Sequence, residues 1–90
     1  IMAGDIRVRC LHTPGHSPGG LCFLVGGHLY SGDTLFAGNV GRTDLWGGDE
    51  DLLLRSIRRR LFTLEDEIQV HPGHGPSSTL GIEKRTNPFL

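Results

Sequence analysis

The sequence predicts an α+β fold in which a mostly antiparallel sheet carries one main helix. Three observations lead to this prediction. Short apolar runs recur between glycine-rich turns, a pattern typical of β-strands. Two of these runs, 21–25 and 29–31, are separated by Gly26 and Gly27, which suit the tight turn of a hairpin. Only the segment 49–64 repeats its leucines and isoleucines at helical spacing.

Four strands are expected. Residues 6–11 alternate apolar and polar side chains through Cys10, which predicts a strand with one buried face. The run 21–25 is apolar throughout and predicts a strand buried on both sides. Residues 29–31 and 68–71 are the third and fourth strands. Between them, residues 35–48, which include Trp46, are glycine-rich and irregular, and connections of this length are often functional.

The expected helix begins after Asp49, whose side chain suits the N-cap position. Glu50 and Asp51 favour its positive end, and the arginines at 58–60 favour its negative end. We interpret the arginine run as a solvated face and not as a nucleic-acid site. The apolar stripe that should pack in the core consists of Leu53, Ile57 and Leu61, with Leu54 and Leu64 beside them. One further helical turn is expected around 81–85.

The composition excludes several classes of function. A net charge of −1 does not favour nucleic acid or an acidic membrane surface as a partner. No apolar run approaches the roughly 20 residues of a membrane span, and the first residues do not resemble a signal peptide. Cys10 and Cys22 lie in apolar runs without Cys-x-x-Cys spacing, which favours buried, reduced thiols over a disulfide or a pair of metal ligands. We therefore expect a cytoplasmic protein without nucleic-acid or membrane partners.

A rigid loop carries two histidines, His12 and His16. Pro14 and Gly15 lie between them, so the pair is not the helical His-x-x-x-His arrangement of a zinc protease. Pro14 and Pro18 restrict the backbone, and a restricted loop can hold an imidazole ring in place for a metal. Alone, a loop histidine is more often a surface residue than a ligand.

Two more potential ligands follow strands in the same way. Asp33 comes after the strand 29–31, and His74 comes after the strand 68–71 in a second Pro-Gly-His turn. Imidazole nitrogen and carboxylate oxygen are ordinary zinc donors, at about 2.0–2.2 Å. An Asx-turn or cap at a strand end is the alternative role for Asp33. Three such positions in this order favour a metal site.

The motifs resemble the metallo-β-lactamase superfamily. The resemblance rests on His-Thr-Pro-Gly-His-Ser-Pro-Gly at 12–19, Ser-Gly-Asp-Thr-Leu-Phe at 31–36, Gly-Arg-Thr-Asp at 41–44 and Pro-Gly-His-Gly-Pro at 72–76. Within the superfamily, the chain is similar to glyoxalase II-like (hydroxyacylglutathione hydrolase-like) single-domain hydrolases, also in its segment 83–89. This implies an αββα sandwich. The His-x-His-x-Asp-His motif of the family is absent, so residues 1–90 would form the C-terminal half of one domain, with the N-terminal half missing.

The resemblance also implies roles for individual residues. His16 would be a ligand of a first metal ion, His74 a ligand of a second, and Asp33 the carboxylate that bridges both. The two ions would be divalent, with zinc expected first and iron or manganese as alternatives. Arg42 would lie near the glutathione part of the substrate, although a plain surface arginine is an equal alternative. His12 would support the site without binding metal.

The remaining two histidines receive structural roles. His28 is expected to be exposed in the hairpin, and His71 to pack beneath the turn of His74.

The implied reaction is hydrolysis of a thioester of the S-lactoylglutathione type by a metal-bound hydroxide. This chain offers only two donors to each ion, whereas catalytic zinc usually has at least three. The chain alone is therefore expected to be inactive and to need the missing half, whose absence would also leave one sheet face uncovered.

Two alternatives remain. The first is a persulfide dioxygenase-like enzyme with one iron, a group that usually has Pro-Ala-His-Asp where this chain has Pro72-Gly73-His74-Gly75. The second is a truncated, non-catalytic fragment.

Overall fold

The computed structural model describes residues 2–3, 6–17, 19–44 and 47–90. Pro18 of the histidine loop and Trp46 of the glycine-rich segment lie outside the described residues. In the described part, six strands form one sheet in the order β1-β2-β3-β4-β7-β8. They are β1 (Met2–Ala3), β2 (Ile6–His12), β3 (Leu21–Val25), β4 (His28–Gly32), β7 (Gln69–Pro72) and β8 (Ser78–Thr79). Neighbouring strands are antiparallel except β4 and β7, which are parallel. The predicted mostly antiparallel sheet with one main helix is confirmed.

The predicted hairpin joins β3 to β4. Val25 pairs with His28, so Gly26 and Gly27 form the two-residue turn, and Gly26 has a φ of 57°. A positive φ costs glycine little because it has no Cβ atom.

The segment 35–48, expected to be irregular, contains a second, smaller hairpin of β5 (Leu35–Phe36) and β6 (Asn39–Val40). Strands of two residues are too short to produce a recognisable alternation in the sequence.

The main helix lies where the leucine spacing predicts it. It comprises α1 (Glu50–Ser56) and continues as a π-helical stretch, η1 (Ile57–Leu61). The Asp49 carboxylate accepts a hydrogen bond of 3.0 Å from the Leu52 amide, which confirms the N-cap. The helix ends at Leu61, earlier than the expected limit near Leu64, and the arginines at 58–60 are exposed as expected.

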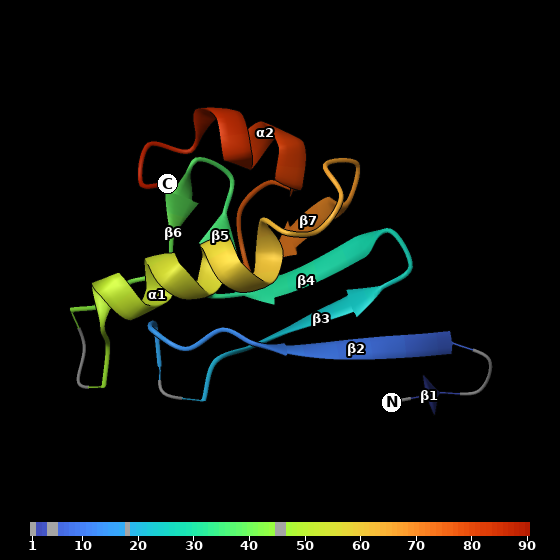
Figure 1. The fold of residues 1–90 in the computed structure, drawn as a ribbon, viewed down its shortest axis with the longest axis horizontal. Coiled ribbons are helices and arrows are strands. Elements are labelled where there is room, and N and C mark those ends of the chain that lie inside the picture. The colour runs from blue at the N-terminus through green and yellow to red at the C-terminus, as the bar shows by residue number, and fades with distance from the viewer. Residues whose placement is uncertain (1, 4–5, 18, 45–46) are drawn as a thin grey trace.

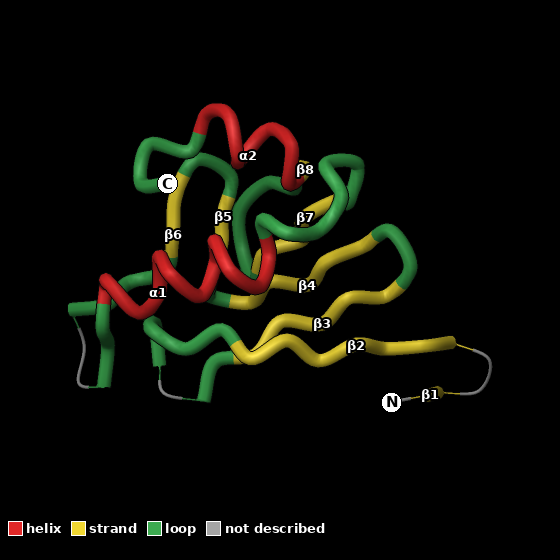
Figure 2. The backbone as a smooth tube through the Cα atoms, in the orientation of Figure 1, coloured by secondary structure: helices red, strands yellow, loops and turns green. Residues whose placement is uncertain are grey.

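The C-terminal helix, α2 (Leu80–Thr86), is longer than the single turn expected there. The Thr79 hydroxyl accepts a hydrogen bond of 3.2 Å from the Ile82 amide and so caps the helix. Figure 2 shows the turn between β5 and β6 beside α2. There the Gly38 amide donates to the Glu83 carboxylate at 2.9 Å, so a buried glutamate fastens this hairpin to the helix.

The hydrophobic core lies between the sheet and the helices, which Figure 1 shows on one side of β2, β3 and β4. The three residues of the predicted helical stripe are fully buried in it. Sheet and helices contribute Leu11, Cys22, Leu24, Leu29, Val70, Leu53, Ile57, Leu61 and Leu80 to this core. No helix in the described part of the chain is long and apolar enough to span a membrane.

The opposite face of the sheet, called the open face below, is not covered by any element in the described part of the chain. It carries Cys10, Leu21, Phe23 and Tyr30, of which the last three are 47%, 39% and 48% exposed. The expectation that the run 21–25 is buried on both sides is therefore wrong, as is the expected burial of Cys10. Successive residues of a strand point to opposite faces, and the helices that the structure describes cover one of them. Cys22, on the covered face, is buried as predicted.

Candidate metal centre

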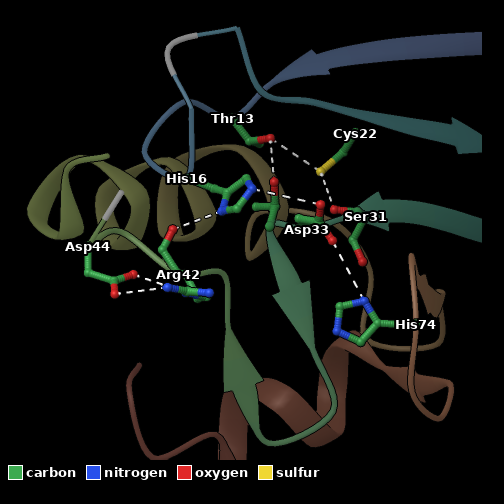
Figure 3. Close-up of polar contacts among 9 residues, drawn as sticks. Thr13, His16, Cys22, Ser31, Asp33, Arg42, Asp44 and His74 are labelled. Atoms are coloured by element: carbon green, nitrogen blue, oxygen red, sulfur yellow. Dashed lines mark hydrogen bonds and ion pairs between the residues drawn. The ribbon is translucent and has the colours of Figure 1, made fainter. Parts of the chain in front are cut away.

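The three predicted ligands line one pocket of about 440 Å³ at the ends of the strands. Figure 3 shows Asp33 between the rings of His16 and His74. The other residues that line the pocket are Phe36, Ala37, Asn39, Val40, Gly41, Arg42, Gly75 and Pro76. Side chains that are far apart in the sequence therefore meet in one depression.

The loop that carries His16 is fastened to the main helix. The Asp49 amide donates to the Gly15 carbonyl at 2.7 Å, and the Ser56 hydroxyl donates to the Pro14 carbonyl at 2.8 Å. Gly15 has a φ of 139°, and a Cβ atom there would overlap the backbone of Leu53 in α1. Glycine therefore permits a close approach that holds the loop against the helix.

One hydrogen bond sets the orientation of the His16 ring. Its Nδ1 atom lies 2.8 Å from the carbonyl oxygen of Arg42. A carbonyl can only accept, so Nδ1 carries the proton, and the lone pair of the neutral ring is on Nε2. Nε2 faces Asp33 Oδ2 at 3.7 Å. A backbone carbonyl behind an imidazole is a common arrangement for a histidine that binds metal.

Asp33 follows β4 and directs its two carboxylate oxygens to different rings. Oδ2 faces His16, and Oδ1 lies 3.8 Å from Nδ1 of His74. Within the described part of the chain, no backbone N–H donates to this carboxylate, so the Asx-turn alternative is not observed. The carboxylate is therefore available to cations on both sides.

His74 lies in the turn after β7. The Gly73 amide donates to the Gly32 carbonyl at 2.8 Å, which brings this turn beside the turn of Asp33. The His74 ring contacts the ring of Phe36, with centroids 4.7 Å apart. It is 78% exposed, against 28% for His16, so the second histidine is the less constrained of the two.

The separations fit metal ions better than hydrogen bonds. Distances of 3.7 and 3.8 Å between nitrogen and oxygen exceed hydrogen-bond length. An ion bound to both atoms at about 2.0–2.2 Å needs them no more than about 4.4 Å apart. Both separations lie within this limit. In the part of the chain that the structure describes, no three His, Cys, Asp or Glu residues surround a single point, so each position has two donors.

The guanidinium of Arg42 is paired with a neighbour. Its Nε and Nη2 atoms donate to the carboxylate of Asp44 at 3.0 and 3.1 Å. These hydrogen bonds raise the pKa of Arg42 and lower the pKa of Asp44. From the sequence, a role was expected for the side chain of Arg42. The contact of Arg42 with His16 is made by its backbone carbonyl, and a backbone contact of this kind cannot be predicted from a residue pattern.

The other histidines lie elsewhere. His12 lines a separate depression with Pro14 and residues of the main helix, and its supporting role stays a prediction. His28 is exposed as expected, but its Nδ1 atom lies 2.8 Å from Nε2 of His71. The other ring nitrogen of His71 lies 3.0 Å from the Ser77 hydroxyl. His71 therefore lies between His28 and Ser77, which directly follows the turn of His74, and the expectation that it packs beneath this turn stays a prediction. The parallel pairing of β4 with β7, which creates the contact, leaves no local signal in the sequence.

Comparison with known proteins places the chain in one family. The family model of the metallo-beta-lactamase superfamily matches residues 4–74. The hydroxyacylglutathione hydrolase GloC of Haemophilus influenzae is 48% identical over 82 residues, which cover 89% of this chain and 39% of that protein. The chain spans about two fifths of the length of the curated relatives that it matches.

Two solved structures are closely similar. The protein TTHA1623, crystallised in a di-iron-bound form, is 50% identical with a TM-score of 0.89, and the match covers 100% of this chain and 45% of that one. ETHE1 from Myxococcus xanthus is 37% identical with a TM-score of 0.93, covering 98% of this chain and 41% of that one. The arrangement of strands and helices described above is therefore shared with these relatives, one of which binds iron.

Proposed function

The chain belongs to the metallo-β-lactamase superfamily, and from this membership we propose that the complete protein is a metal-dependent hydrolase of a thioester of the S-lactoylglutathione type. The observation that supports this most directly is the carboxylate of Asp33, whose two oxygens face the nitrogens of two different histidines at 3.7 and 3.8 Å. The relative named hydroxyacylglutathione hydrolase supports the class of substrate.

Each residue would have a distinct task. His16 would bind one divalent ion through Nε2, because its Nδ1 proton is committed to the Arg42 carbonyl. His74 would bind a second ion through Nδ1, and Asp33 would bind both. This donor set suits zinc first, with iron and manganese as alternatives. When bound, such ions lower the pKa of a water molecule and polarise a carbonyl oxygen.

The pocket offers room for the acyl part of a small thioester. Phe36, Ala37, Val40 and Pro76 form apolar walls beside the three ligands, and such walls exclude water from a reacting carbonyl. Arg42 lies on the rim, where its guanidinium would meet an anionic group of the substrate only after it leaves Asp44. We therefore assign Arg42 a secondary part in binding substrate.

The chain would need the rest of the protein to act. Two donors at each position, counted over the described residues, are fewer than the three or more that catalytic zinc usually has. The open face, with Leu21, Phe23 and Tyr30, is an apolar surface of the kind that a further layer covers. Without the rest of the protein, the chain would be a non-catalytic fragment, the second alternative considered from the sequence.

A second function has one specific observation in its favour. The structure of ETHE1 from Myxococcus xanthus superimposes with a TM-score of 0.93, which supports a persulfide dioxygenase-like enzyme with one iron. The turn Pro72-Gly73-His74-Gly75, which lacks the Pro-Ala-His-Asp pattern of that group, favours the hydrolase.

Metal analysis of the full-length protein, combined with two assays, tests the proposal. We expect two ions per molecule and cleavage of S-lactoylglutathione without oxygen consumption. One iron per molecule with oxygen consumption in the presence of a persulfide would replace the hydrolase by the dioxygenase. A full-length protein that retains no metal would contradict both functions.

A further inference from the structure

A group of small polar side chains is buried directly behind the candidate ligands. Thr13, Cys22 and Thr34 are 0%, 0% and 3% exposed. The Thr13 hydroxyl lies 3.3 Å from Cys22 Sγ and 3.3 Å from the Thr34 hydroxyl, and Figure 3 shows it between the His16 loop and the Asp33 turn. A hydroxyl has one proton and two lone pairs, so it can donate to one of these neighbours and accept from the other.

The two threonines belong to the two segments that carry ligands. Thr13 is in the loop of His16, where its amide donates to the Gly20 carbonyl at 2.9 Å and closes the loop. Thr34 directly follows Asp33, and its carbonyl accepts from the Gly41 amide at 3.0 Å. The bond between the two hydroxyls therefore joins the base of one ligand-bearing segment to the base of the other.

No hydrogen bond joins the side chains of the two candidate ligands His16 and Asp33 directly. His16 and Asp33 are 3.7 Å apart, beyond hydrogen-bond length. The contact of His16 with Arg42 orients the ring and reaches the turn of Asp33 only through the backbone, where the Gly41 amide donates to the Thr34 carbonyl. In the absence of metal, the spacing of the two ligands depends on the backbone segments that carry them.

We propose that Thr13 is a positioning residue, whose buried hydrogen bond to Thr34 sets the spacing of His16 and Asp33 before metal binds. The inference rests on the proposed function for its consequence, metal affinity. Its geometric basis is independent of that function. A valine in place of Thr13 keeps the shape of the side chain but removes the hydroxyl. Cys22 and Thr34 then each lose a partner in a site where little water is available to replace it.

The test uses the full-length protein and three variants. Thr13→Val removes the hydroxyl, and Thr13→Ser restores it without the methyl group. Ser78→Ala is the matched control, because the Ser78 hydroxyl also makes a partly buried hydrogen bond, to Glu83 at 2.7 Å. That bond joins β8 to α2 and touches neither the His16 loop nor Asp33.

Two measurements are made on each protein. The first is the affinity for zinc by competition with a chelator, together with the absorption spectrum of the cobalt-loaded form, which reports ligand geometry. We expect Thr13→Val to lower the affinity on the order of tenfold and to change the spectrum. Thr13→Ser should lie within about twofold of the original protein, and Ser78→Ala should not differ from it. The second is amide hydrogen exchange of the metal-free protein, which should rise at residues 13, 15, 16, 33 and 34 in Thr13→Val alone.

The outcomes separate the two proposals. Unchanged zinc affinity and cobalt spectrum in Thr13→Val would overturn the positioning role and leave the hydrolase intact. If the original protein binds no metal, the proposed function fails, and amide exchange alone decides whether Thr13 couples the two segments. Should Thr13→Val not fold, Thr34→Val breaks the same bond from the other side. A normal affinity in that variant would equally overturn the inference.

Discussion

The Nδ1 atom of His16 lies 2.8 Å from the backbone carbonyl oxygen of Arg42, so Arg42 contacts this ring through its peptide group and not through its charge. The guanidinium points away to the carboxylate of Asp44 (Figure 3). Two parts of one residue are thus available for two separate tasks, orientation of a ligand and recognition of an anion. A substitution of the Arg42 side chain can remove the recognition of an anion, but it leaves the carbonyl that orients His16.

The pairing of Arg42 with Asp44 leads to a prediction about substrate affinity. In the full-length protein, Asp44→Ala should lower the KM for an anionic thioester about two- to threefold, because the guanidinium is then no longer paired with a carboxylate of its own chain. Arg42→Ala should raise the KM by a similar factor and leave the metal content unchanged, since the carbonyl remains. Steady-state kinetics and metal analysis check both. A KM that responds to neither substitution would exclude contact between Arg42 and substrate.

Asp33 is expected to control the retention of the second ion. In the full-length protein, Asp33→Ala removes the carboxylate that faces both histidines, and we expect the metal content to fall from two ions to one or fewer per molecule. His28→Ala is the control, because His28 is also exposed but contacts His71. Metal analysis after dialysis checks this prediction. Two ions retained in Asp33→Ala would count against the bridging role.

The meeting of the three candidate ligands was more predictable from the sequence than the contacts around them. His16, Asp33 and His74 each follow a strand and are flanked by glycine, a local pattern, and the structure places all three in one pocket. The His28–His71 contact depends on the parallel pairing of β4 with β7. These strands are far apart along the chain, and their register cannot be derived from residue order.

Burial was predicted correctly only where this chain supplies both sides of the contact. Leu53, Ile57 and Leu61 pack against the sheet as their spacing indicates. Phe23 and Cys10 are equally apolar, yet they are exposed on the open face. The alternation within one strand shows that a side chain favours burial, whereas the uncovered sheet face was expected only from the missing His-x-His-x-Asp-His motif.

The contact of Gly15 with the main helix predicts a large difference between two glycine substitutions. Gly15→Ala places a Cβ atom against the backbone of Leu53 at a φ of 139°, and we expect a loss of about 1–3 kcal/mol in the free energy of unfolding. Gly27→Ala is the control, since a Cβ atom at Gly27 meets open space. It should change the stability by less than about 0.5 kcal/mol. Urea denaturation measures both, and equal midpoints would refute the close approach of the loop to α1.

The ion pair of Lys84 with Asp66 predicts a pH dependence of stability. The ammonium lies 2.6 Å from Asp66 Oδ1 and lowers the pKa of this carboxyl, chiefly through the hydrogen bond. A carboxyl with a lowered pKa in the folded state adds stability above its unfolded pKa, about 4, and loses it as the pH falls through the folded value. Asp66→Asn should therefore lower the urea midpoint at pH 7, and the difference should shrink towards pH 2.

The Lys84→Met variant is the matched background for this measurement. Without the ammonium, the pKa of Asp66 is no longer lowered by its main cause, so Asp66→Asn should have little effect at either pH. A difference between the original protein and Asp66→Asn that is the same at pH 7 and pH 2 would show that the ion pair does not act through the titration of Asp66.

The two cysteines allow a test of whether the open face is covered in the complete protein. Cys22 is fully buried in the core, and burial raises the pKa of its thiol, so it should react with a thiol reagent only on unfolding. Cys10 lies on the open face beside Phe23 and is exposed in the 90-residue chain. If a further layer packs on that face, Cys10 of the native full-length protein should be protected as well. Mass spectrometry after a timed reaction, with a urea-unfolded sample to define full modification, distinguishes the two thiols. Rapid modification of Cys10 in the native full-length protein would show that the open face stays exposed there and would contradict the requirement for a covering half.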